Sequence, residues 1–173
     1  MSKSQLSREE RAFYQAEAFR KIGTSKTLGE AFEANLNVIN VAEVCVAFAL
    51  EVYLKILIGL QFGNPPRTHS LVELFACLNQ PTQDRVRKHF AAIPRRPEVV
   101  AALTAAGAPS DFDGMLAVSD DAFVRARYSY ENATRASNKG WLGTEIMEAV
   151  RQIILDAHPV WGTRTPKPTK VPM

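Results

Sequence analysis

The sequence NVAEVCVAFALEVYLKILIGL, residues 40–60, decides the fold of this chain. It is almost wholly apolar, and its polar members are Asn40, Glu43, Glu51 and Lys55. At 3.6 residues per helical turn, these positions form one slowly drifting stripe. A buried charge is tolerated only when it is paired or hydrogen-bonded. The pattern therefore predicts a long central helix that carries a polar seam.

The composition indicates a soluble globular protein. The chain has 173 residues, of which 46% are hydrophobic and 23% charged, and these fractions are ordinary for one domain. A net charge of +3 permits an anionic partner without requiring one. Residues 38–60 are long enough to cross a bilayer, but membrane spans rarely carry three charged residues. We therefore expect a helix surrounded by other helices and no membrane association.

The N-terminal residues and the two cysteines favour a cytoplasmic protein. The first residues are polar and lack the hydrophobic core of a signal peptide. Cys45 and Cys77 both lie in apolar helical patterns, which is typical of buried thiols in a reducing compartment. No cysteine and histidine pair has the spacing of zinc ligands. We expect neither a metal ion nor another cofactor.

The rest of the chain has helical patterns and no convincing strand. Ser7-Arg-Glu-Glu is a capping box that opens a helix ending near Gly23. The seam helix is expected to start at residue 27 or 28 and to end at Leu60, before the breaker Gly63-Asn-Pro-Pro. Further helices are expected from residue 68 or 70 to 79, over 82–93, 97–106 and 119–137, and from residue 142 or 144 to 157, with one turn or a loop over 111–118.

The chain therefore predicts an all-α, compact helical bundle. We assign residues 1–158 to a single domain. From residue 159 onward the sequence is rich in proline and basic residues, which favours an extended tail over residues 159–173.

Three segments together resemble the HEPN superfamily. They are ALEVYLKILIGL at residues 49–60, THSLVELF at residues 68–75 and FVRARYSYE at residues 123–131. The resemblance covers most of residues 27–157. It implies a helical bundle, frequently a homodimer, with a functional groove where the late helices of two protomers meet. Many relatives are metal-independent endoribonucleases of toxin, CRISPR or phage-defence systems, whereas others are non-catalytic binding or assembly modules.

Catalytic members of this superfamily use an arginine followed four to six residues later by a histidine. Attack of a ribose 2′-hydroxyl on its phosphodiester requires positive charge on the phosphate and proton transfer near neutral pH. Arginine and histidine have these properties. This chain has Arg125 and Arg127, but no histidine follows either at that spacing. The sequence thus departs from the family at the residue that transfers the proton.

The candidate catalytic residues are Arg125, Tyr128 and His69. The tyrosine hydroxyl can donate to a phosphate, and its ring can stack on a base. His69 starts a predicted helix, and the fold could bring it near Arg125 in place of the missing histidine. Each residue also has a structural interpretation: Arg125 and Tyr128 as a dimer contact, and His69 as a helix cap or loop contact.

Further basic residues are candidates for phosphate binding. Arg127 is one, and the run RVRKHF supplies Arg85, Arg87 and Lys88, with two more arginines at residues 95 and 96. The alternative for this run is an ordinary solvated basic face.

Glu51 and Lys55 have the favourable i, i+4 order of an ion pair. Two interpretations remain open for this pair. It is either purely structural, with Glu51 bonded to Lys55 or to an arginine of the helix containing Arg125, or it supports that helix and orients Arg125.

Three classes of function are consistent with these residues. The first is an RNA-directed HEPN protein of a toxin, defence or stress-response system, acting as a divergent metal-independent endoribonuclease. The second is a non-catalytic HEPN module that binds a protein or nucleotide, or that dimerises. The third is a purely structural helical dimer. The partners expected from the resemblance are a second copy of the chain, RNA and a cognate protein from the same operon.

Overall fold

The long apolar stretch forms the central helix of an all-α structure. The computed structural model describes residues 6–25, 37–95, 97–105, 107–120 and 143–163. Each regular element in these ranges is an α-helix, which confirms the predicted fold class. The helices are α1 (Arg8–Gly23), α3 (Asn37–Phe62), α4 (Leu71–Ala76), α5 (Gln80–Ala92), α6 (Pro97–Ala105), α7 (Phe112–Ser119), α9 (Thr144–Ala157) and α10 (Pro159–Thr163).

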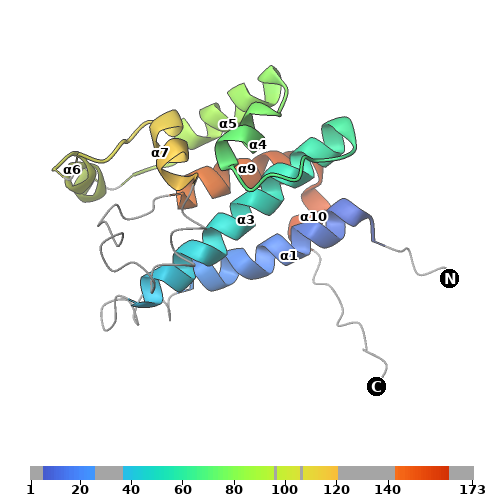
Figure 1. Ribbon diagram of the computed structural model, residues 1–173, viewed down its shortest axis with the longest axis horizontal. Coiled ribbons are helices and arrows are strands. Elements are labelled where there is room, and N and C mark those ends of the chain that lie inside the picture. The colour runs from blue at the N-terminus through green and yellow to red at the C-terminus, as the bar shows by residue number, and fades with distance from the viewer. Residues whose placement is uncertain (1–5, 26–36, 96, 106, 121–142, 164–173) are drawn as a thin grey trace.

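The other helices pack around α3. Helix α1 lies along it, and α9 packs against it from another side (Figure 1). Helix α4 contacts α3, α5 contacts α9, and α7 contacts both α4 and α5. The apolar side chains between these helices form one core, whose largest fully buried members include Phe13, Leu50, Tyr53, Leu54, Leu74, Met115, Ile146 and Met147. The predicted start of the seam helix, at residue 27 or 28, lies outside the described residues.

Short-range patterns account for most helix ends. The Ser7 hydroxyl accepts a hydrogen bond from the Glu10 amide at 3.0 Å, as the capping box predicts. Asn79 caps α5 in the same way. Helix α3 ends at Phe62, and the next residue, Gly63, has a φ of 92° that only glycine readily adopts. Helix α4 is capped by Ser70 and ends at Ala76, three residues before the predicted end.

The segment over residues 111–118, predicted as a turn or loop, is largely helical. The Asp111 side chain caps α7 by accepting from the Gly114 amide at 2.8 Å. Phe112 packs against Phe75 of α4 and Phe90 of α5, with ring centroids 4.8 and 5.3 Å away. This burial fixes a helix that is too short to be stable alone.

The tail predicted to be extended from residue 159 is helical in its first part. Pro159 begins α10, because the first turn of a helix needs no amide hydrogen from it. The Trp161 ring lies 5.6 Å from the ring of Phe13 and stacks on His158. Residues 159–163 therefore pack against the bundle, and the rest of the predicted tail lies outside the described residues. Cys45 is buried as expected, whereas Cys77 is exposed.

Among the described residues, no helix is long and apolar enough to cross a membrane. This includes α3, in which Glu43, Glu51 and Lys55 interrupt the apolar sequence.

We expect Gly23→Ala to lower the free energy of unfolding by about 1–3 kcal/mol, the usual cost of overpacking. A Cβ atom at Gly23 would lie 2.5 Å from Cγ2 of the buried Val46 and 3.0 Å from the Ala42 carbonyl oxygen. The last turn of α1 therefore approaches α3 too closely for a methyl group.

Urea unfolding measures this effect, and Gly59→Ala is the matched control. The nearest atoms to a Cβ at Gly59 are 3.9 Å away, so alanine there should stabilise α3 by up to about 1 kcal/mol. A Gly23→Ala protein as stable as the wild type would contradict the close approach.

Candidate functional site

Three side chains of the predicted site meet at the seam of α3. Both carboxylate oxygens of Glu51 lie 3.1 Å from Nδ1 of His69. The Lys55 Nζ atom donates to Oε1 of the same carboxylate at 2.7 Å. Since both nitrogens contact Oε1, they lie at most 5.8 Å apart, the sum of the two distances. Glu51 thus contacts His69 as well as its predicted partner Lys55.

The three side chains differ in how far they are exposed to solvent. The Glu51 side chain is 6% exposed, while those of Lys55 and His69 are 24% and 69% exposed. A buried carboxylate needs such partners to offset its lost hydration. The carboxylate is thus fixed inside the protein, and the imidazole it contacts reaches the surface.

The contact with Glu51 determines the form of the His69 ring. An ionised carboxylate only accepts hydrogen bonds, so with Glu51 ionised this contact selects the form of His69 that has its hydrogen on Nδ1. In the neutral ring the lone pair is then on Nε2. A carboxylate that orients a histidine in this way also stabilises the imidazolium formed when Nε2 takes up a proton. The arrangement is suited to general base catalysis.

The loop that carries His69 is fixed on both sides. Its neighbour Thr68 donates from its hydroxyl to Glu73 at 2.7 Å. The Ser70 hydroxyl donates to Oδ1 of Asp120 at 2.8 Å, and the Val72 amide donates to the same oxygen at 2.9 Å. Asp120 therefore ties the end of α7 to the start of α4, directly beside His69. No local sequence pattern predicts this contact, because Ser70 and Asp120 are 50 residues apart.

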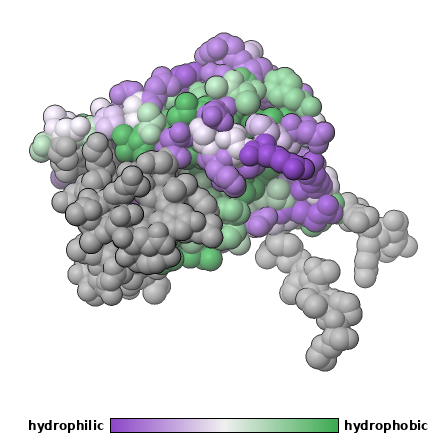
Figure 2. Space-filling model, viewed as in Figure 1, coloured by the Kyte–Doolittle hydropathy of each residue, from purple (hydrophilic) through white to green (hydrophobic). Residues whose placement is uncertain are grey.

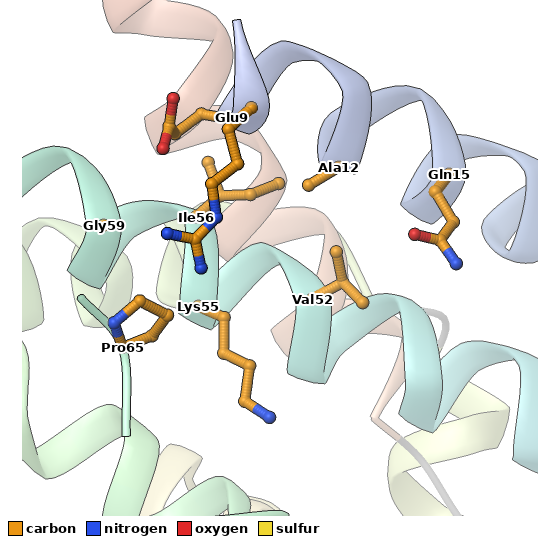
Figure 3. Close-up of a pocket in the computed structure, with 9 residues that line it drawn as sticks. Glu9, Ala12, Gln15, Val52, Lys55, Ile56, Gly59 and Pro65 are labelled. Carbon is orange, nitrogen blue, oxygen red and sulfur yellow. The ribbon is translucent and has the colours of Figure 1, made fainter. Parts of the chain in front are cut away.

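A pocket of about 220 Å³ adjoins Lys55. It lies between α1 and α3, beside the loop after α3, and Lys55 lines it (Figure 3). Figure 2 shows one face of the molecule, on which hydrophilic side chains surround patches of apolar surface. The lining residues are Arg8, Glu9, Ala12, Gln15, Val52, Lys55, Ile56, Gly59 and Pro65.

The basic run on α5 is paired with carboxylates. The Arg85 guanidinium lies 3.0 Å from Asp156 of α9. Asp156 also accepts from Gln152 and lies 3.3 Å from His89. The hydrogen bond from Gln152 is the largest cause of the lowered pKa of Asp156. Burial opposes it, while the charge of His89 and the hydrogen bond and charge of Arg85 lower the pKa further.

Two further arginines of this region contact aromatic rings as well as carboxylates. Arg87 lies 2.9 Å from Asp113, and its guanidinium is 5.0 Å from the ring centre of Phe75. The residue predicted to extend the patch, Arg95, lies 3.3 Å from Glu145 and over the ring of Phe90. Such contacts fix the arginines structurally. Lys88 is exposed, and residue 96 lies outside the described residues.

Arg125, Arg127 and Tyr128 also lie outside the described residues. Their predicted roles are therefore untested by the structure. His69, Glu51 and Lys55 are the predicted site residues that it brings together.

Sequence reasoning missed a second charged cluster, which joins α1, α3 and α9. Oε1 of Glu17 accepts from the Tyr53 hydroxyl and from Nε of Arg151, both at 2.5 Å. Arg20 lies 3.2 Å from the same carboxylate and 3.1 Å from Glu148. The i, i+3 spacing of Glu17 and Arg20 was a weak local signal, but Arg151 is 134 residues from Glu17.

The cluster shifts the titration of its members. Burial by itself raises the pKa of Glu17, but the hydrogen bonds from Arg151, Tyr53 and Arg20 outweigh it, so the pKa is lowered. Burial, and then the hydrogen bond to Glu17, raise the pKa of Tyr53. The tyrosine therefore remains a neutral donor, and the cluster is suited to fixing three helices rather than to catalysis.

Within the described ranges, no group of three or more histidine, cysteine or acidic residues could hold a metal ion. No protein-family model, curated protein or solved structure gave a significant match to the chain. The function is therefore argued from the side-chain geometry and the sequence.

Proposed function

We propose that this protein is a HEPN-like, RNA-directed protein of a toxin, defence or stress-response system. In this proposal it is a divergent endoribonuclease that needs no metal ion and uses His69 as its proton acceptor. The observation that carries the proposal is the contact of His69 with the buried Glu51 carboxylate. It supplies a histidine for proton transfer where the motif beginning at Arg125 has none.

The reaction that fits these groups is attack of a ribose 2′-hydroxyl on the adjacent phosphorus. Nε2 of His69 takes the hydroxyl proton, and Glu51 stabilises the resulting imidazolium. The bond from O2′ to phosphorus forms as the bond to O5′ breaks. The products are a 2′,3′-cyclic phosphate and a 5′-hydroxyl, whose oxygen takes a proton from water. The Lys55 ammonium, at most 5.8 Å from Nδ1 of His69, favours the negative charge on phosphate.

Arg125 and Arg127 are proposed to bind phosphate, with Tyr128 donating its hydroxyl or stacking on a base. Asp120 is bonded beside His69, through Ser70. Arg125 follows Asp120 by five residues in the sequence, which motivates assigning them to one proposed site. A homodimer and a cognate partner protein belong to the same proposal.

The alternative is a non-catalytic HEPN module that binds a protein or nucleotide, or that dimerises. The pairing of Arg85 with Asp156 and of Arg87 with Asp113 favours this alternative. Arginines that already bind carboxylates attract a phosphate backbone less strongly.

Cleavage of labelled single-stranded RNA tests the proposal. The wild-type protein is incubated with the RNA in the presence of a chelator, beside His69→Ala and Arg125→Ala. We expect cyclic phosphate ends from the wild type and a rate at least about 10²-fold lower for each variant, because each removes a group that acts in the transition state.

His89→Ala is the matched control, since His89 also contacts a carboxylate but lies on α5. It should cleave at the wild-type rate. Unchanged cleavage by His69→Ala and Arg125→Ala would refute the site assignment. Absence of cleavage by a wild-type protein that still binds RNA would favour the non-catalytic alternative.

A further inference from the structure

We propose that the pocket between α1 and α3 binds one nucleotide of the RNA, with the base inside and its phosphate at the rim. This inference rests on the proposed function for its ligand class. The pocket shares Lys55 with the group formed by Glu51 and His69. A nucleotide held there would lie next to the group proposed to act on the backbone.

The size and the floor of the pocket favour a single base. Its volume of about 220 Å³ is below the roughly 300–1,000 Å³ of sites for drug-sized ligands. The floor is apolar and is formed by Ala12, Val52, Ile56, Gly59 and Pro65 (Figure 3). The described residues that line the pocket include no aromatic ring for stacking, so these aliphatic groups would contact the face of a base by apolar burial.

The polar lining provides both kinds of contact that a nucleotide needs. Arg8 and Lys55 are cations that attract a phosphate. The Gln15 amide can donate and accept, whereas the Glu9 carboxylate only accepts. A base edge with an amino group suits Glu9, while uracil offers only its ring N3–H, between two carbonyl oxygens that repel the carboxylate. Adenine, guanine and cytosine should therefore bind better than uracil.

Gly59 keeps the floor open. A Cβ atom at this position would have its nearest neighbours, Cγ and Oε1 of Glu9, at 3.9 Å. A methyl group is therefore accommodated, whereas a larger side chain extends into the space that the base would occupy. Substitution at Gly59 thus tests the pocket without touching Glu51 or His69.

Calorimetric titration of the full chain with AMP, GMP, CMP and UMP tests the inference. We expect UMP to bind about tenfold more weakly than the other three nucleotides, the scale of one unsatisfied polar contact. Gly59→Leu should weaken AMP binding about tenfold or more.

Arg8→Ala provides a second variant that does not depend on filling the pocket. Arg8 is exposed, so its loss should weaken AMP about fivefold, the scale of an exposed charge pair, and leave adenosine unchanged. Equal binding of AMP by wild type, Gly59→Leu and Arg8→Ala, or no binding of any nucleotide, would overturn the inference.

His69→Ala separates this inference from the proposed function. His69 does not line the pocket, so the variant should bind AMP like the wild type even where RNA cleavage is lost. Cleavage without nucleotide binding would refute the pocket alone. Nucleotide binding without cleavage by the wild type would refute the nuclease proposal alone.

Discussion

Glu17→Gln is expected to lower the free energy of unfolding by about 3 kcal/mol at pH 7. The Glu17 side chain is 12% exposed, and its carboxylate bonds to Tyr53, Arg151 and Arg20. Neutralising it leaves two guanidinium groups, 18% and 20% exposed, with Glu148 as their remaining shared counter-charge. Breaking a buried ion pair by removing one partner costs about 3–5 kcal/mol. Urea unfolding followed by circular dichroism measures the difference.

The same variant has a predictable dependence on pH. The pKa of Glu17 is lowered from its ordinary value of 4.5 in the folded protein. The folded state therefore binds this proton less readily than the unfolded state. The stabilisation is present above about pH 4.5 and is lost as the pH falls through the lower, folded pKa. The difference between wild type and Glu17→Gln should accordingly shrink below pH 4.5.

Asp113→Asn is the control for this effect. Asp113 also pairs with an arginine, but its side chain is 68% exposed, so its loss should cost under about 1 kcal/mol. If Glu17→Gln were as stable as Asp113→Asn at pH 7, the cluster would not hold the three helices together.

The fold could be predicted from local patterns wherever neighbours in sequence determine the structure. Ser7 caps α1 because its partner amide is three residues away, and the helical pattern up to residue 157 predicts α9. These signals depend on helical periodicity alone. Helix α10 was missed because its proline-rich composition indicates an extended chain, while Trp161 reaches the distant Phe13.

The candidate site was predictable in its residues but not in its contacts. The apolar surroundings of Glu51 and Lys55 marked them as partners, and the structure confirms that pair. The contact of Glu51 with His69 depends on how the loop after α3 folds back, which no periodicity encodes. The carboxylate partners of Arg85 and Arg87 are also far from them in the sequence, at separations of 71 and 26 residues. Charge patterns therefore located basic residues without revealing how they are neutralised.

Glu51→Gln is expected to lower kcat for RNA cleavage by about 10³-fold and to change KM little. The carboxylate holds Nδ1–H of His69 and stabilises the imidazolium that forms as the 2′-hydroxyl loses its proton. Glutamine keeps the size of the side chain but removes the charge. An equivalent change in a serine protease triad costs about 10⁴-fold, and the smaller figure here reflects an imidazole that is 69% exposed to water. Single-turnover kinetics with labelled RNA measures kcat and KM separately.

A merely structural role for Glu51 would give a different result. Lys55 and His69 both reach solvent, so water can hydrate them in the variant, and the helical spectrum should be retained. Glu73→Gln makes the same chemical change in the adjacent loop contact with Thr68 and should cleave at the wild-type rate. Nitrogen NMR of the His69 ring should show loss of the fixed Nδ1–H form in Glu51→Gln alone. A folded Glu51→Gln protein with wild-type kcat would exclude this carboxylate from catalysis and leave the pair with Lys55 as an element of stability.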